Sequence, residues 1–378
     1  MKLLCVLLLV VTITYAEQHK YIIKTLTNNA LDNISTQFKS NMVIKGEFNF
    51  GEKSGIIGFV AVMDEQTAAA LGKENNIISI TKSQELPPIR TIDIPYKNSL
   101  ARVVQKNVTY GLDMIDRVMD GNYVFNGTGE GVNIFIVDSG VKDDHPEFEG
   151  RVKWGFSISD HKDTTEHGTH VAGIAASKTF GVAKKATLIS VKVMNDDRKA
   201  STADVILGLN YVLSEHKSSG KPSVVNMSFG GSHYVFGVLQ EPIMALVEAG
   251  IAFSTSAGNN SEDACSHAPG GRLKGVLCVA ASDKDYNLSM FSNFGECVNI
   301  VAPGDEILST CVNTPTCYKT GTSMASPVVA GVLAQAYSMR KFKNVQEAYD
   351  FVLKNSQTGV LKHLIRQTPD LLVSTPKY

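Results

Sequence analysis

The chain has 378 residues, of which 43% are hydrophobic and 19% charged, as in globular proteins with a sizeable core. Its formal net charge of −1 gives no reason to expect nucleic acid or an anionic membrane surface as a partner. After the N-terminal residues, no stretch is apolar over the roughly 20 residues that a membrane-spanning helix needs.

The first residues have the pattern of a secretory signal peptide. Lys2 precedes an apolar run from Leu3 to Ile13, and Thr14-Tyr15-Ala16 puts small residues where signal peptidase cuts. The run is too short to anchor the chain across a hydrocarbon core of about 30 Å. We therefore expect cleavage after Ala16 and delivery to a compartment beyond the cytosol, such as the extracellular space, a cell wall or a lytic vacuole.

Residues 17–86 have a pattern of their own that predicts a small α+β domain. The expected order is strand, helix, strand, strand, helix, strand, which is ferredoxin-like. The strands are expected at 21–26, 42–50, 55–63 and 77–86, and the helices at 31–38 and 64–71. Two prolines end this unit, and residues 87–109 are basic and aperiodic, which predicts a linker with a processing site.

Residues 110–378 predict an α/β domain in which helices cover both faces of a parallel sheet. Residues 132–137 are almost continuously apolar, as in a strand that is buried on both faces. Further strands are expected at 188–193, 224–227 and 251–255, and helices at 171–177, 203–215, 240–249 and from 323 to about 337. In such sheets functional residues gather at the carboxyl ends of the strands.

Three segments of this domain carry reactive side chains. Asp138 stands where a buried strand stops, and His167 and Ser323 each stand at the start of a helix. Singly, these are ordinary positions for a turn aspartate, a structural histidine and an N-cap serine. Together they supply what nucleophilic catalysis needs, because a serine hydroxyl requires a base and an imidazole base requires an orienting carboxylate.

Asn259 follows another buried strand and adds a fourth group. Its side-chain amide and the backbone N–H at the helix start of Ser323 are suitable donors to a developing oxyanion. A turn asparagine is the ordinary alternative, since Gly-Asn is a common turn pair.

The order Asp, His, Ser and four local segments identify a family. The segments are His145–Arg151, His167–Gly173, Ala257–Asn259 and Gly321–Pro327. They resemble subtilases of the proteinase K branch, with similarity from about Tyr110 to Tyr337. The resemblance implies a secreted serine endopeptidase with a subtilisin-like three-layer fold, made as a zymogen whose residues 17–86 are an inhibitory propeptide.

The same resemblance implies roles for individual residues. Asp138 would orient His167, His167 would act as base and acid, Ser323 would be the nucleophile, and Asn259 would complete the oxyanion hole. Substrate binding would involve Ser228, Phe229, Gly230, Ala257 and Gly258. The small walls of this pocket favour broad, apolar specificity. The implied partners are polypeptide substrates and the chain's own propeptide, and we expect a monomer.

The cysteines suit an oxidising compartment. Cys5 leaves with the signal peptide, so five cysteines remain. Cys265 and Cys297 match a paired position in relatives, and Cys311 and Cys317 lie close together in one loop, so both pairs are expected to form disulfides. Cys278 lies in an apolar run and is expected to be a buried free thiol.

No cofactor is required by this chemistry and no metal ligands are assigned, while a structural calcium ion is left open as an alternative. The proteinase K-like calcium site uses an aspartate where this chain has Asn299, a weaker ligand. His167 and His170 are three residues apart, but the H-E-x-x-H pattern of a zinc protease is missing. Sequons for N-glycosylation occur at Asn33, Asn107, Asn126, Asn226, Asn259 and Asn287, and the loop residues Asn126 and Asn287 are the expected acceptors.

Two other classes of protein fit the sequence less well. An α/β-hydrolase needs the order Ser, acid, His, and its serine lies in a G-x-S-x-G turn, whereas position 325 is Ala. A catalytically inactive binding protein with the same fold would have lost one or more of the four active-site residues.

Overall fold

The fold is known from a computed structural model that describes residues 17–27, 30–38, 41–51, 54–86, 92–93 and 108–376. The expected signal peptide and most of the expected linker lie outside these residues. By contacts within the chain, residues 1–47 and 57–83 form one unit, and residues 48–56 and 84–378 form a second. The small unit therefore ends slightly before residue 86, because the Leu86 N–H bonds to the Ala200 carbonyl at 2.7 Å in the large unit.

The small unit has the element order that the sequence predicts. Its elements are β1 (His19–Thr25), α1 (Ala30–Gln37), β2 (Met42–Asn49), β3 (Ile57–Met63), α2 (Glu65–Leu71) and β4 (Ile77–Lys82). The strands form one sheet in the order β2-β3-β1-β4, as in ferredoxin-like domains. Its core includes Ile23, Phe59, Met63 and Leu71, each at most 1% exposed. Asp64 caps α2 by accepting the Thr67 N–H at 2.7 Å.

The large unit is built on seven parallel strands in the order β14-β13-β11-β9-β6-β8-β7. The strands are β6 (Asn133–Asp138), β7 (Val152–Ser157), β8 (Thr187–Lys192), β9 (Ser223–Met227), β11 (Ile251–Ser256), β13 (Leu277–Ser282) and β14 (Ile300–Pro303). The inner strands β6, β9, β11 and β13 are buried along their whole length. Burial on both faces explains their apolar runs.

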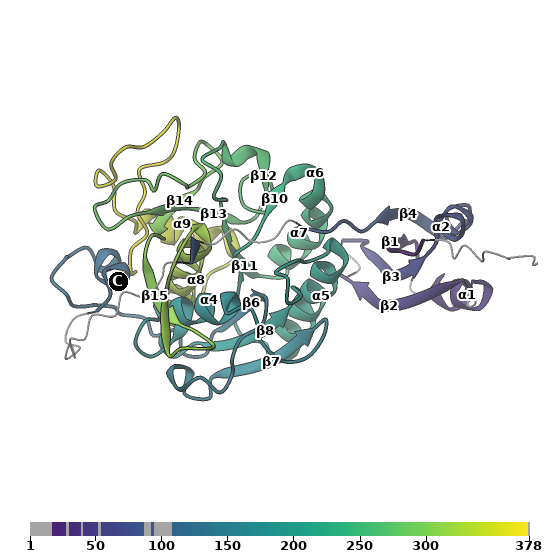
Figure 1. Cartoon of the computed structure of the whole chain (residues 1–378), viewed down its shortest axis with the longest axis horizontal. Helices are drawn as coiled ribbons and strands as arrows, with labels where there is room; N and C mark the ends of the chain where they lie inside the picture. The colour runs from purple at the N-terminus through teal and green to yellow at the C-terminus, as the bar shows by residue number, and fades with distance from the viewer. Residues whose placement is uncertain are drawn as a thin grey trace, which may run out of the picture. The chain divides into compact units, whose positions relative to one another are not determined.

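Helices cover both faces of this sheet, which gives the predicted three layers. On one face lie α4 (His167–Ala176), α8 (Thr322–Met339) and α9 (Val345–Lys354), and on the other lie α5 (Thr202–Ser219) and α7 (Gln240–Glu248) (Figure 1). Ser201 caps α5, and Gly220 ends it in a left-handed conformation with φ of 61°. Helix α8 is buried through most of its length, which matches its continuous apolar sequence.

The remaining elements lie around the edges of the sheet. They are α3 (Tyr110–Asp113), α6 (His233–Phe236), β5 (Ile92–Asp93), β10 (Gly231–Ser232), β12 (His267–Ala268), β15 (Ile307–Thr310), β16 (Thr316–Thr320) and four short 3₁₀ turns. The hairpin β15–β16 is extended by β5 and leads directly into α8. Within the described ranges, no helix is long and apolar enough to cross a membrane.

The cysteines are arranged as expected. Cys265 is bonded to Cys297, 32 residues away, and Cys311 is bonded to Cys317 across the turn between β15 and β16. Cys278, on β13, is a buried free thiol. Burial in this apolar core raises the pKa of the Cys278 thiol far above its usual range.

Candidate active site

The sequence-predicted site residues meet at the carboxyl edge of the parallel sheet. Asp138 is the last residue of β6, and Ser256 ends β11 just before Ala257. His167 begins α4, and Ser323 is the second residue of α8. The parallel arrangement brings these segments to one edge of the sheet, although they are up to 185 residues apart in the sequence.

Asp138 and His167 form a fully buried pair. Nδ1 of His167 lies 2.8 Å and 3.0 Å from the two carboxylate oxygens of Asp138, and both side chains are 0% exposed. Gly168 makes the close approach feasible, because a Cβ there would stand 2.0 Å from the carbonyl oxygen of Gly140. The carboxylate therefore fixes Nδ1 as the protonated nitrogen and leaves Nε2 as the basic one.

Asp163 was not predicted from the sequence as a site residue, although its carboxylate positions the segments of Asp138 and His167 relative to each other. Its Oδ1 accepts from Ser139 Oγ at 2.9 Å and from the Thr165 and Glu166 N–H groups at 3.1 Å. Its Oδ2 accepts from the N–H and hydroxyl of Thr169 at 2.9 and 2.6 Å. The buried carboxylate thus ties the residue after Asp138 to the first turn of α4, where His167 lies.

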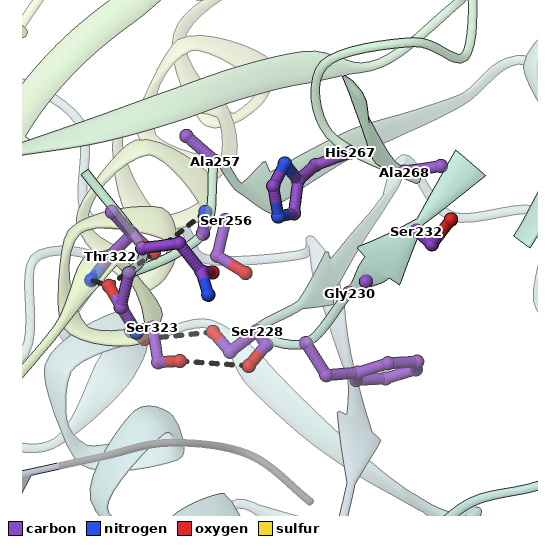
Figure 2. A pocket seen from close by; sticks show the side chains of 14 residues that line it. Ser228, Gly230, Ser232, Ser256, Ala257, His267, Ala268, Thr322 and Ser323 are labelled. Carbon is purple, nitrogen blue, oxygen red and sulfur yellow. Dashed lines mark hydrogen bonds between the residues drawn. The ribbon is translucent and has the colours of Figure 1, made fainter. Parts of the chain in front are cut away.

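Ser323 is held beside this pair by the segment after β9. Its hydroxyl donates to the Ser228 carbonyl oxygen at 2.9 Å, and the hydroxyl of Ser228 donates back to the Ser323 carbonyl at 2.8 Å (Figure 2). Among the described residues, Nε2 of His167 has no hydrogen-bond partner. Catalytic hydrogen bonds are often long or absent without substrate.

A neutral hydrogen-bond network surrounds the first turn of α8, which contains Ser323. Asn226 donates from Nδ2 to Ser228 Oγ at 2.9 Å and accepts from Ser326 Oγ at 2.8 Å. Ser254 Oγ donates to the Ser326 carbonyl at 2.8 Å. All of these side chains are fully buried, so they fix the first turn of α8 without placing a charge there.

Asn259 is oriented by Thr322, the residue before Ser323. Its Oδ1 accepts from the N–H of Thr322 at 2.8 Å and from its hydroxyl at 2.9 Å. The same hydroxyl accepts from the Gly258 N–H at 3.1 Å. With Oδ1 engaged by Thr322, the donor end of the amide is Nδ2, as an oxyanion hole requires.

A pocket adjoins Ser323 and contains every residue that the sequence assigned to substrate binding. Its walls are formed by the segments 228–232 and 256–260, and it is closed by His267, Ala268 and Thr322 (Figure 2). Gly258 has a φ of 107°, and a Cβ there would stand 2.3 Å from Asn293 Nδ2. Sequence reasoning did not find His267, because its segment carries no motif.

His170 belongs to the core behind the pair and not to a metal site. Its Nε2 lies 3.1 Å from the Ile307 carbonyl oxygen and 3.0 Å from that of Cys317. Burial, with a smaller contribution from Lys319, lowers the pKa of His170 to about 3. In the described part of the chain, the sole group of metal-ligand atoms close together is Glu166 with Cys311 and Cys317, whose sulfurs are bonded to each other.

Comparison with known proteins identifies this arrangement. Residues 129–374 match the model of the subtilase family, Peptidase_S8. The chain belongs to the subtilase family. It is 33% identical to the extracellular serine proteinase of Thermus sp. (strain Rt41A), over 84% of this chain and 75% of that protein. It is 35% identical to the subtilisin-like serine protease Rho m 2.0101 of Rhodotorula mucilaginosa, over 79% of this chain and 91% of that protein.

The fold is shared with solved subtilases. A crystal structure of a cold adapted subtilisin-like serine proteinase matches with a TM-score of 0.66 and 32% sequence identity, covering 72% of this chain and all of that one. The matches cover from 57% to 91% of the curated relatives' lengths. The chain is thus a serine-type endopeptidase of the subtilase family, and its substrates are polypeptides.

Proposed function

We propose that this subtilase is a secreted endopeptidase of broad specificity, made as a zymogen, which cleaves peptide bonds through an acyl-enzyme on Ser323. The observation that carries the proposal is the buried contact of 2.8 Å between His167 Nδ1 and Asp138, with Ser323 at the start of α8 at the same edge of the sheet. A histidine so oriented has its basic nitrogen available to the serine hydroxyl.

The residues divide the reaction between them. His167 takes the proton of the Ser323 hydroxyl as its oxygen attacks the scissile carbonyl, and Asp138 stabilises the resulting imidazolium. The oxyanion is stabilised by Asn259 Nδ2 and by the Ser323 N–H, one of the N–H groups that a helix start leaves without an intrahelical partner. His167 then gives its proton to the leaving amine, and water hydrolyses the acyl-enzyme by the same steps in reverse order.

Substrate binding follows from the pocket walls. The backbone of Ser228, Phe229 and Gly230 would pair with an extended peptide, which recognises the main chain and tolerates varied side chains. Ala257 and Gly258 would contact the side chain before the scissile bond, called P1, and offer it apolar walls. We propose broad specificity on this ground. No cofactor takes part in these steps.

The small unit is proposed to be an inhibitory propeptide. It has a core of its own, and none of the residues that we assign to chemistry lies in it. The chain that connects it to the catalytic unit would occupy the substrate groove, and cleavage within residues 87–109 would release the enzyme. Because the two parts are tethered, the first cut is effectively intramolecular.

The test is to express the full-length precursor with Ser323→Ala beside the unmutated chain. Loss of the nucleophile lowers turnover by a factor on the order of 10⁶ in subtilisin, so the variant precursor should stay uncut in a purified system. A fluorophosphonate probe should label the unmutated enzyme at Ser323 and leave the variant unlabelled. Trimming of the variant at the same bond and rate would refute self-processing, and an unmutated chain that is neither labelled nor able to cleave any peptide would refute the protease.

Secretion and glycosylation complete the proposal. We propose that the chain enters the secretory pathway, acts as a monomer and carries a glycan at Asn126, which is exposed. Asn287 is the second proposed acceptor; its Nδ2 donates to Asp283 Oδ2 at 2.8 Å and that of Asn126 to the Pro376 carbonyl oxygen at 3.2 Å, so a glycan at either position replaces a hydrogen bond. Asn226 is buried, and the side chains of Asn33 and Asn107 lie outside the described residues. Mass spectrometry of the secreted protein tests the leader cleavage and the glycan together.

A further inference from the structure

The far end of the proposed P1 pocket is formed by one imidazole ring. His267 lies on β12, which pairs with β10 so that His267 stands opposite Ser232. The ring points into the space between the two walls (Figure 2). On one side the ring faces Gly258, which has no side chain. A Cβ at this position would stand 3.4 Å from Cδ2 of His267. The side chain of His267 is 15% exposed, so it is accessible from the pocket.

The hydrogen bonds of Ser266 determine which nitrogen of this ring carries the proton. The hydroxyl of Ser266 donates its one hydrogen to the Asp263 carbonyl oxygen at 2.8 Å. The same Ser266 oxygen lies 3.0 Å from Nδ1 of His267. Because its one hydrogen is already donated, it must accept from Nδ1, so Nδ1 carries a hydrogen. In a neutral imidazole the other nitrogen, Nε2, is then a hydrogen-bond acceptor.

A second acceptor lies close to Nε2. Glu262 Oε2 is 3.7 Å from it, beyond hydrogen-bond distance. The end of the pocket thus presents an imidazole lone pair that can accept from a donor, and the Glu262 carboxylate lies beside the ring without lining the pocket. The glycine and alanine walls before them offer no charge to a side chain that passes between them.

We infer that His267 is a specificity-determining residue that makes the enzyme prefer P1 side chains with an apolar body and a hydrogen-bond donor at the tip, above all tyrosine. The ring of tyrosine would fill the space between the walls, and its hydroxyl would donate to Nε2 of His267. Phenylalanine has the same shape and lacks the donor. This inference rests on the proposed function, because it takes this pocket to be the P1 site.

The experiment uses the mature enzyme and peptide p-nitroanilides that differ only at P1, with Tyr, Phe, Leu or Arg. Assays are run at mildly alkaline pH, where imidazole side chains are ordinarily neutral. We expect kcat/KM for Tyr to exceed that for Phe by about 3- to 10-fold, the usual effect of one added hydrogen bond. His267→Leu should bring the ratio to about 1 by lowering the value for Tyr, while cleavage of the Phe substrate shows that the variant is folded.

Glu262→Gln is the matched control, because it removes the neighbouring charge and leaves the imidazole. The preference for Tyr over Phe should survive in this variant. If Arg is the best substrate and Glu262→Gln abolishes that preference, the carboxylate selects P1 and the inference is wrong. Equal cleavage of Tyr and Phe by the unmutated enzyme would also overturn it. Cleavage of none of the four substrates, without fluorophosphonate labelling, would instead overturn the proposed function.

Discussion

The histidine half and the serine half of the site are held by different kinds of hydrogen-bond partner. Around His167 the central group is the buried carboxylate of Asp163, which gathers donors from the first turn of α4 and from Ser139. Around Ser323 the corresponding groups are neutral, the amide of Asn226 and the hydroxyls of Ser228 and Ser326. Each set is buried and each fixes the start of one helix.

The charge that each half gains during catalysis accounts for this difference. In the proposed mechanism His167 becomes a cation in the transition state, and buried carboxylates nearby stabilise a cation. At Ser323 the substrate carbonyl becomes an anion, and a buried carboxylate there would oppose it. The neutral network therefore holds the nucleophile in place without this electrostatic cost.

Removing the donor on the serine side should have the largest effect on turnover. We expect Asn259→Ala to lower kcat by about 10²–10³, equivalent to about 2.7–4 kcal/mol, because the oxyanion loses a donor that matters only in the transition state. KM should change little. Steady-state kinetics on one peptide substrate measure both constants. If KM rose by this factor and kcat stayed unchanged, Asn259 would instead contribute to binding of the substrate ground state.

Neutralising the carboxylate on the histidine side should affect both stability and turnover. Asp163→Asn replaces one acceptor oxygen by a donor that faces the N–H and hydroxyl of Thr169. We expect the free energy of unfolding to fall by about 2–3 kcal/mol and kcat/KM by about 10- to 100-fold, through misplacement of His167.

Asp144→Asn is the control for this change, since Asp144 is 78% exposed and should leave both quantities unaltered. The pH profile of kcat/KM separates positioning from general destabilisation, because an altered His167 environment moves its acid limb. If the pH profile of Asp163→Asn does not move, and activity falls only in proportion to the fraction of unfolded protein, Asp163 has no positioning role.

Acid should destabilise the histidine half through His170. The pKa of this residue falls from 6.5 to about 3 on folding, so between these values the unfolded chain binds a proton that the folded chain excludes. Its contribution to stability is thus present above pH 6.5 and is lost as the pH falls, by about 1.4 kcal/mol per pH unit. Denaturant unfolding at several pH values should show a shallower acid dependence for His170→Gln, and an unchanged slope would assign it to other groups.

A single deletion in the neutral network should have the smallest effect. Ser326→Ala removes the hydroxyl that donates to Asn226, and we expect a loss of about 1 kcal/mol in the free energy of unfolding. Turnover should stay within a few-fold, since Ser228 still contacts Ser323 directly. A loss of activity as large as that of Asp163→Asn would show that the two halves are not held differently after all.

The sequence predicted the four central strands of the sheet, β11, β9, β6 and β8, and missed the strands towards its two edges. Strands β6, β8, β9 and β11 each contain at least two consecutive apolar residues, whereas β7 contains lysine, tryptophan and glycine and was not expected. Strands β13 and β14 were also missed, although Cys278 was correctly placed in a buried apolar run. Helix α9 is amphipathic and was missed because prediction relied on the resemblance up to residue 337.

The reactive residues could be found because each lies in a short segment with a recognisable pattern. Asp163 could not, because only the fold brings Ser139 to its carboxylate, and an aspartate in the loop Lys162–Glu166 looks like an exposed turn residue. His267 could not, because its role depends on the hydrogen that Ser266 gives to Asp263. Both residues act through long-range or cooperative contacts that a linear pattern does not contain.

The buried thiol of Cys278 offers a way to measure local opening of the sheet in the catalytic unit. The thiol lies on β13, next to the strand that leads to Ala257 and Asn259, and burial keeps it protonated and shielded from solvent. An alkylating reagent can reach it only when that part of the sheet opens. The rate of its modification under native conditions therefore measures how often the strands beside the pocket open, and the other four cysteines of the catalytic unit do not react, because they are joined in disulfides.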